Sequence, residues 1–352
     1  MRLFICLLAV TFMANTSVKA QSPKVQEKAY THKNLTVFLL EDNNRISQRY
    51  VTLEEAMKDN KITLHETGSV NELSVDNKSD NYVFIMAGDI VKGGKQDRTI
   101  GEDVVLRPQA KKVPLKSFCV EQSRWTKRGN EKVTEFSAST QTLSDKKLKI
   151  AARSSKSQSA VWKEVNDFQE NAGKNINKNV KSSASATSLQ LTLEDKDLRA
   201  SVKEYLNALM PVIKGTNGTN IVGLAFCING KISTVEWFGN SSLYNKLIPK
   251  ILESAANEAL SNYDPKAQYT QVGAGAISDF IRAAQHGKAS SQKTGDRTLE
   301  KQYKTANSIM FESYYSTVSE TTAIHVSIYS TDGVALDAQV NVTNQLPVRV
   351  RR

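Results

Sequence analysis

The residue types best suited to chemistry gather between residues 87 and 125. Two adjacent glycines, Gly93 and Gly94, begin a predicted turn there. Four polar residues follow them directly: Lys95, Gln96, Asp97 and Arg98. Paired glycines let the backbone turn with positive φ, and the N–H groups exposed in such a turn can surround an anion. The segment therefore predicts a cradle for a phosphate or carboxylate, without the spacing of a P-loop. The alternative is an ordinary hairpin turn whose polar residues face water.

A second group of reactive side chains lies downstream, in a strand-like run. Cys119 and Glu121 are two residues apart, so strand alternation places the thiol and the carboxylate on one face. Such a pair could serve nucleophilic or acid–base chemistry. This chemistry usually needs a further base, and His325 is the best placed of the four histidines. The alternative is structural: a buried thiol, with Glu121 paired to Arg124 or Arg98.

Trp125 follows Arg124 at the end of this run and could stack on a sugar or a base. The predicted ligand-binding residues are Gly93, Gly94, Lys95, Gln96, Asp97, Arg98, Arg124 and Trp125. The expected partner is an anionic small molecule or a glycan, and no cofactor is expected. A metal site is not expected either, because the sequence has no CxxC pair and no Cys/His cluster.

The composition is basic but not patterned for nucleic acid. The 352 residues include 47 Lys and Arg against 36 Asp and Glu, which gives a formal net charge of +11. These cations are spread along the chain with no interleaved aromatic residues, so a nucleic-acid partner is not expected. Cys119 and Cys227 lie in strand-like, apolar surroundings, where they could form a disulfide in an oxidising compartment or stay as buried thiols.

The first twenty residues have the pattern of a secretory signal. Arg2 precedes an apolar stretch over residues 3–13, and Val18-Lys19-Ala20 is a small-residue cleavage site. The apolar stretch is too short to span a bilayer, and no later segment is apolar enough to do so. We therefore expect an exported protein, periplasmic or extracellular, without a transmembrane segment.

Short strands at close spacing predict a β-rich, sandwich-like first half. The expected strands there cover residues 35–40, 62–65, 70–75, 82–86, 104–106, 115–121 and 148–152. The second half mixes helices, expected near residues 161–173, 198–209, 243–263 and 277–286, with strands at 221–228, 232–238, 308–315 and 323–329. Asn229-Gly230 is the strongest hairpin signal in the chain. The predicted fold class is α+β.

The predicted organisation has one structured domain. A signal peptide over residues 1–20 and a flexible lead over 21–33 precede an α+β domain over 34–330. This domain is β-rich over 34–153 and mixed over 154–330, and a tail follows over 331–352. Within the domain, residues 175–188 are rich in Asn, Lys and Ser, which is typical of a mobile loop.

Several strings in the sequence carry a family resemblance. The most specific are TLEEAMKDNKITLHETGSVNELSVDN, AGDIVKGGKQDR and FCVEQSRW, and a looser likeness continues through QSAVWKEV and GLAFCINGKISTVEWF. They resemble a bacterial family, the ARG and rhodanese-phosphatase-superfamily-associated protein domain. The family is named for its association with ADP-ribosylglycohydrolases, and the resemblance implies a link to ADP-ribose or NAD-derived ligands.

Three functions are compatible with these residues. The favoured one is an exported binding module for an anionic, sugar-like or nucleotide-like ligand. The second is a hydrolase of glycosidic or ester bonds that uses Cys119 and Glu121. The third is a cell-envelope interaction protein without a small ligand.

Overall fold

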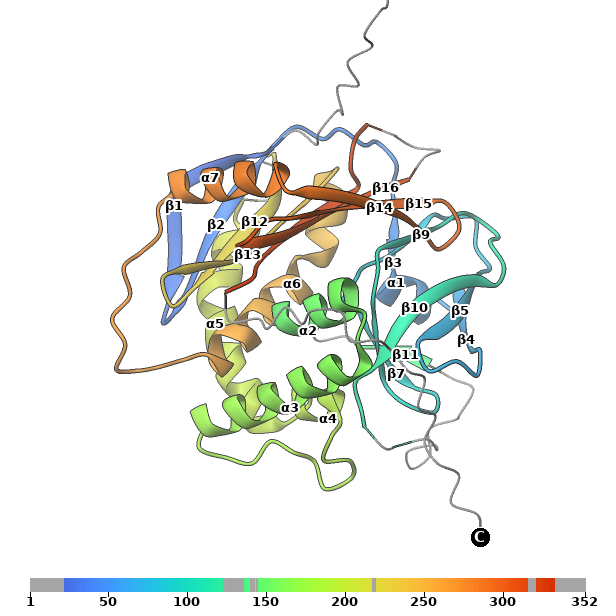
Figure 1. The fold of residues 1–352 in the computed structure, drawn as a ribbon, viewed down its shortest axis with the longest axis horizontal. Helices are drawn as coiled ribbons and strands as arrows, with labels where there is room; N and C mark the ends of the chain where they lie inside the picture. Colours follow the sequence, from blue (N-terminus) through green and yellow to red (C-terminus); the bar gives the residue numbers. More distant parts are fainter. Residues whose placement is uncertain are drawn as a thin grey trace, which may run out of the picture.

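The computed structural model describes residues 22–122, 124, 136–139, 143, 145–216, 220–315 and 321–332. Helices and strands are mixed along this part of the chain, and most strand pairs are antiparallel, which confirms the predicted α+β class (Figure 1). The predicted signal peptide, Trp125 and the tail from residue 333 lie outside the described residues.

An eight-stranded antiparallel sheet joins the two ends of the described chain. In spatial order its strands are β1 (Lys24–His32), β2 (Leu35–Glu41), β12 (Ile221–Ile228), β13 (Lys231–Phe238), β17 (His325–Ser330), β16 (Ser308–Tyr315), β15 (Thr298–Lys304) and β14 (Lys288–Thr294). The turn between β12 and β13 is the predicted hairpin, with φ values of 52° at Asn229 and 71° at Gly230. Because β2 pairs with β12, the β-rich first half and the mixed second half share one sheet.

Two smaller sheets form the rest of the first half, on the right in Figure 1. One has the order β11 (Phe136–Ala138), β7 (Ile90–Gly93), β8 (Arg98–Ile100), β10 (Val113–Cys119), β5 (Glu72–Asn77) and β4 (Ile62–Glu66). The other has the order β3 (Val51–Thr52), β6 (Val83–Ile85) and β9 (Val104–Leu106). Apolar side chains from both sheets pack into one core cluster, so this region is a compact, nearly closed β-structure.

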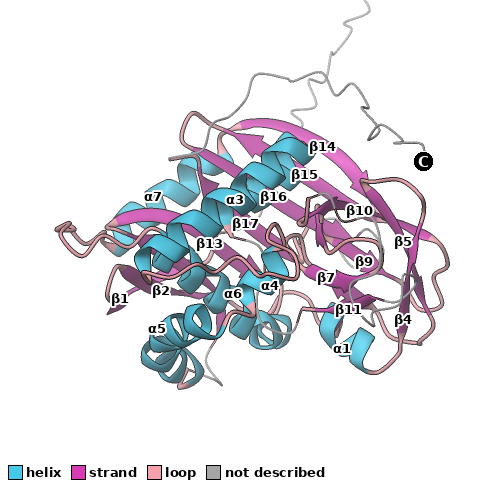
Figure 2. Ribbon diagram, turned by 90° about the horizontal axis from the view of Figure 1, so that it is seen from below, coloured by secondary structure: helices cyan, strands magenta, loops and turns pink. Residues whose placement is uncertain are grey.

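Helices cover both faces of the eight-stranded sheet (Figure 2). The helices of the described residues are α1 (Leu53–Lys58), which packs on the two smaller sheets, α2 (Lys146–Ile150), the π-helix η1 (Ala151–Ser155), α3 (Gln158–Asn175), α4 (Leu189–Leu193), α5 (Lys196–Lys214), α6 (Ser241–Ser261) and α7 (Ala274–Gln285). Side chains of α3, α5 and α6 share a core with one face of β2 and β12, whereas α7 packs on the opposite face. None of the helices in the described ranges combines the length and the apolar character needed to cross a membrane.

Several local expectations were wrong. Residues 24–32, expected to be flexible, form β1, because their backbone pairs with β2 although most of their side chains are polar. Residues 148–152, expected to be a strand, are helical, because the Asp145 side chain accepts a hydrogen bond from the Leu148 N–H at 2.9 Å and caps α2. The mobility expected for residues 175–188 stays a prediction: Val180 and Ser188 are buried there, and the other residues are half-buried or exposed.

Gly223 tests the packing of this sheet, because β12 and β13 approach each other closely there. A Cβ atom at Gly223 would lie 2.2 Å from the carbonyl oxygen of Glu236. We expect Gly223→Ala to lower the free energy of unfolding by about 1–3 kcal/mol in urea denaturation. The control is Gly275→Ala in α7, where a Cβ meets nothing within 4 Å, and which should raise stability by roughly 0.5–1 kcal/mol. Equal effects at the two positions would contradict the described packing.

Candidate functional site

The turn at Gly93 and Gly94 has the predicted backbone conformation. Their φ values are 115° and 58°. The anions that its N–H groups bind belong to the protein itself: the Gly93 N–H donates to Asp97 Oδ1 at 2.9 Å, and the Lys95 N–H donates to Glu66 Oε1 at 3.1 Å. All residues from 93 to 98 except Lys95 are buried. The predicted anion cradle is therefore present, but internal carboxylates occupy it.

Four of the predicted ligand-binding side chains form a polar and ionic network around this turn: those of Gln96, Asp97, Arg98 and Arg124. Arg98 is fully buried, lies 3.1 Å from Glu66 and donates to the Val70 carbonyl. Arg124 Nε lies 2.6 Å from Glu121, and its NH2 group lies 3.4 Å from Asp97. Two further hydrogen bonds close the network, from Gln96 Nε2 to the Glu121 carbonyl at 2.8 Å and from Ser188 Oγ to Asp97 at 3.2 Å. The pairing of Glu121 with Arg124 matches the structural alternative given for this residue in the sequence analysis. A ligand at these residues stays a prediction.

Cys119 is placed as a structural residue. Its side chain is buried, and its backbone exchanges hydrogen bonds of 2.9 and 2.8 Å with the amide side chain of Gln158. Burial raises the pKa of the Cys119 thiol to about 11, so the thiolate needed for nucleophilic attack is scarce at neutral pH. His325 lies in the eight-stranded sheet, where it contacts Asp103, and Cys119 lies in the six-stranded sheet, where its backbone bonds to Gln158. Cys227 is also a buried free thiol, with a pKa raised to about 12 by burial.

Thiol labelling tests this placement. In the native protein we expect Cys119 and Cys227 to react with Ellman's reagent far more slowly than in urea, because both thiols are buried and protonated. Rapid labelling of Cys119 in the folded protein would restore the nucleophile hypothesis. Resistance to labelling in urea without reductant would instead indicate a disulfide.

The structure brings His325 into a cluster that the sequence did not predict. Its Nδ1 lies 2.8 Å from Asp103 Oδ2. Arg153, on the π-helix, lies 2.8 Å from the same oxygen and 2.6 Å from Glu300 on β15. Ser313 Oγ also donates to Asp103 Oδ2, at 2.7 Å. We call these five residues the Asp103–His325 cluster. Its members come from five separate segments of the chain, which is why spacing along the sequence could not reveal it.

Charge pairing in this cluster overcomes the cost of burial. Burial alone would raise the pKa of Asp103, but the charge of Arg153 and the contact with His325 hold it far below its usual range. Burial likewise opposes a charged Arg153, yet Asp103 and Glu300 raise its pKa above the usual value. Asp103 and Arg153 are therefore both charged inside the protein.

Acid titration tests this ionisation. Because the pKa of Asp103 is lower in the folded than in the unfolded state, its contribution to stability is present above the unfolded pKa and is lost as the pH falls below it. We expect the free energy of unfolding to fall between about pH 5 and pH 2, and less steeply in Asp103→Asn than in the wild type. Equal slopes in urea titrations would contradict the assignment.

A second set of buried ion pairs lies between α2, α6 and the sheet. Lys149 Nζ lies 3.1 Å from Glu236, and Lys146 Nζ lies 3.7 Å from Glu258. They line a cavity of about 10 Å³, room for roughly one water molecule. Burial and then the charge of Glu258 raise the pKa of nearby Asp145 to about 7. This cavity is too small for a ligand larger than water.

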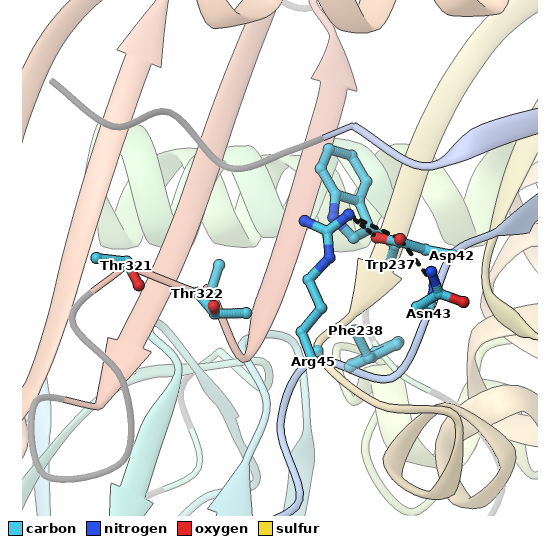
Figure 3. A pocket seen from close by; sticks show the side chains of 9 residues that line it. Asp42, Asn43, Arg45, Trp237, Phe238, Thr321 and Thr322 are labelled. Carbon is cyan, nitrogen blue, oxygen red and sulfur yellow. Dashed lines mark hydrogen bonds and ion pairs between the residues drawn. The ribbon is translucent and has the colours of Figure 1, made fainter. Parts of the chain in front are cut away.

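A surface pocket lies where β2 and β13 end and β17 begins (Figure 3). Its lining residues are Asp42, Asn43, Arg45, Trp237, Phe238, Gly239, Thr321, Thr322 and Ala323, and its volume is about 20 Å³. Arg45 NH2 lies 2.6 Å from Asp42, beside the indole of Trp237 in Figure 3. We call this surface pocket the Arg45–Trp237 pocket. Sequence reasoning missed it because its residues come from three loops or strand ends with no shared motif.

No three His, Cys, Asp or Glu side chains of the described residues gather closely enough to hold a metal ion.

Comparison with known proteins identifies one family. Its model, the ARG and Rhodanese-Phosphatase-superfamily-associated Protein domain, matches residues 24–329. The chain belongs to this family. No curated protein and no solved structure shows significant similarity to this chain.

The ARG and Rhodanese-Phosphatase-superfamily-associated Protein domain accounts for nearly all of the described structure. Its match begins at the first residue of β1 and ends in β17, two strands of the same eight-stranded sheet. The ion network at Gly93, the Asp103–His325 cluster and the Arg45–Trp237 pocket all lie within the matched range. The resemblance seen in the sequence is thus confirmed over the whole domain.

Proposed function

We propose that this chain is a binding module for a sugar-like or nucleotide-like ligand with hydroxyl and anionic groups, and that the ligand binds at the Arg45–Trp237 pocket. The observation that carries the proposal is the chemistry of the pocket: an Arg–Asp ion pair, an amide and two hydroxyls beside an indole. Carboxylate, amide and hydroxyl groups pair with the hydroxyls of a sugar, a guanidinium pairs with phosphate or carboxylate, and an indole packs on an apolar ring face.

The size of the pocket limits how the ligand binds. A volume of about 20 Å³ accepts only one small group, so most of the ligand would rest on the surrounding surface. We therefore expect weak binding, with Kd of order 10 μM to 1 mM, because little ligand surface is buried.

The Gly93 turn supports a ligand less well than the pocket. Its N–H groups and arginines are paired with internal carboxylates, so an anion would have to displace Asp97 or Glu66. In the Arg45–Trp237 pocket, Asp42 and Arg45 keep partial exposure, at 14% and 24% of their side chains. Their groups can contact a ligand without unfolding the site.

Thermal-shift measurements with ADP-ribose, AMP and glucuronate test the proposal. ADP-ribose comes first because the family is named for its association with ADP-ribosylglycohydrolases. We expect at least one of these probes to raise the Tm, and the variants Arg45→Ala and Asp42→Ala to abolish the shift. Probes that leave the wild-type Tm unchanged, or shift these variants equally, would refute the proposed site.

We also propose that the protein is exported, on the strength of the signal-like pattern over residues 1–20. Its ligand would then be an extracellular or periplasmic molecule. Fractionation of expressing cells tests this, and a protein confined to the cytosol with residues 1–20 intact would contradict it.

A further inference from the structure

The strand β14 forms one edge of the eight-stranded sheet. Its inner side pairs with β15 along the whole strand, from Lys288 opposite Lys304 to Thr294 opposite Thr298. No strand among the described residues pairs with its outer side, which we call the β14 edge. In an antiparallel pair, every second residue directs its N–H and C=O groups away from the partner strand. The β14 edge therefore presents a row of backbone donors and acceptors.

The side chains of β14 leave this edge accessible from both faces of the sheet. Residues 288–291 and Lys293 are all exposed, although alternate residues of a strand point to opposite faces. The side chains in the middle of this run are small, those of Ala289, Ser290 and Ser291. A strand added beside β14 would therefore meet little steric resistance over the centre of the pairing.

The exposed charges on and beside β14 are positive. They belong to the lysines of β14, to the last residue of β15 and to the residue that follows η1: Lys288, Lys293, Lys304 and Lys156. Lys156 belongs to this group because its Nζ donates to Gln292 Oε1 on β14 at 2.8 Å. Burial and then the charge of Lys116 lower the pKa of Lys156, as expected where cations lie close together.

The neighbouring acidic side chains do not cancel this charge at the surface. Glu102, Glu300 and Glu312 are buried, so they do not face an approaching partner. Asp296, in the turn between β14 and β15, is exposed but already pairs with Arg107 at 2.8 Å. The β14 edge therefore presents a net positive charge to its surroundings.

This charge decides which strand fits the edge. Antiparallel pairing of two copies of β14 about Ser290 and Ser291 would set Lys288 of each copy opposite Lys293 of the other, and like charges directly opposite are destabilising. Lysines on an edge strand commonly prevent such self-pairing. A strand with acidic side chains meets the opposite condition, because its carboxylates would lie beside these lysines.

We propose that the β14 edge is a docking site for an extended acidic segment of another protein, which adds as a further strand to the eight-stranded sheet. Backbone hydrogen bonds to β14 supply the affinity, and the lysines select carboxylate side chains. This inference goes beyond the proposed function, because the residues that line the Arg45–Trp237 pocket come from other strands and loops.

Hydrogen exchange of the full chain, measured by NMR, tests strand addition directly. The probe is a seven-residue peptide that alternates threonine with glutamate and has blocked ends. We expect saturating peptide to slow exchange of the outward N–H groups of residues 288–294 about tenfold or more, because the added strand accepts their hydrogen bonds. The same peptide N-methylated at every residue keeps its charge but has no N–H groups, and should bind at least tenfold more weakly. Equal binding of the methylated peptide would overturn the proposal.

Charge reversal tests the role of the lysines. With a fluorescent form of the threonine–glutamate peptide, we expect Lys288→Glu with Lys293→Glu to raise the Kd about tenfold or more in anisotropy titrations. The matched control is Lys24→Glu with Lys28→Glu on β1, the opposite edge of the sheet, where both lysines are also exposed and Glu27 lies between them. This control changes the net charge equally and should leave the Kd within about twofold of the wild type. Equal weakening in the two double variants would overturn the proposal, since it would indicate attraction by net charge alone.

The remaining outcomes identify other occupants of the edge. We expect the wild type to sediment as a monomer without the peptide. A dimer whose formation protects residues 288–294 from exchange would overturn the proposal in favour of a second copy of this chain. If the peptide gives no protection at all, the docking site is likewise overturned, and the proposed binding of small ligands at the Arg45–Trp237 pocket is unaffected.

Discussion

Arg153→Met should lower the free energy of unfolding by about 3–5 kcal/mol, because it leaves buried carboxylates without their cation. Arg153 is 2% exposed and lies within 3 Å of both Asp103 and Glu300. Methionine retains much of the side-chain length but none of the charge. Asp103 and Glu300 would then have to take up protons or admit water, and either change disturbs the contact between the first-half β-structure and the eight-stranded sheet.

The control for this variant is Arg107→Met. Arg107 also pairs with a carboxylate, Asp296, at 2.8 Å, but its side chain is 48% exposed. An exposed ion pair contributes about 0–1 kcal/mol, so this variant should be close to the wild type in urea denaturation. A similar small loss in both variants would show that the Asp103–His325 cluster does not stabilise the fold.

Arg98→Met should have an effect of similar size, about 3–5 kcal/mol, because it leaves Glu66 facing a buried apolar side chain. Arg98 is fully buried, and its guanidinium contacts both Glu66 and the Val70 carbonyl. The double variant Arg98→Met with Glu66→Gln should be more stable than Arg98→Met alone, since it also removes the Glu66 carboxylate charge that Arg98 had paired with. Urea denaturation of the three proteins measures this coupling.

Arg282→Met provides the comparison for Arg98. The Arg282 side chain is 68% exposed, and its pair with Asp279 should contribute little. If Arg98→Met unfolds no more easily than Arg282→Met, the network around the Gly93 turn is not structural, and its arginines become stronger candidates for ligand binding.

The sequence predicted the features that depend on local patterns. The Asn229-Gly230 hairpin and the amphipathic helix α5 are both present, because turn chemistry and apolar periodicity act over a few residues. Edge strands were harder to predict. Nearly all side chains of β1 and β14 are exposed or half-buried, and backbone pairing holds these strands, which leaves little apolar alternation in the sequence.

The site could be predicted only in part, for a similar reason. Gly93 and Gly94 correctly indicated positive φ, but the sequence could not show that the N–H groups of this turn donate to the internal carboxylates of Asp97 and Glu66. The clustering of Asp103 with His325 depends on segments more than 200 residues apart, which no local spacing encodes. The Arg45–Trp237 pocket likewise arises only when three strand ends meet.

The central claim is that ligands bind at the Arg45–Trp237 pocket and not at the Gly93 turn. The most direct test is calorimetric titration of the probe that shifts the wild-type Tm into two variants, Arg45→Ala and Lys95→Ala. We predict that Arg45→Ala weakens binding about tenfold or more, whereas Lys95→Ala binds like the wild type. Loss of binding in Lys95→Ala with full binding in Arg45→Ala would contradict the claim and place the ligand at the turn.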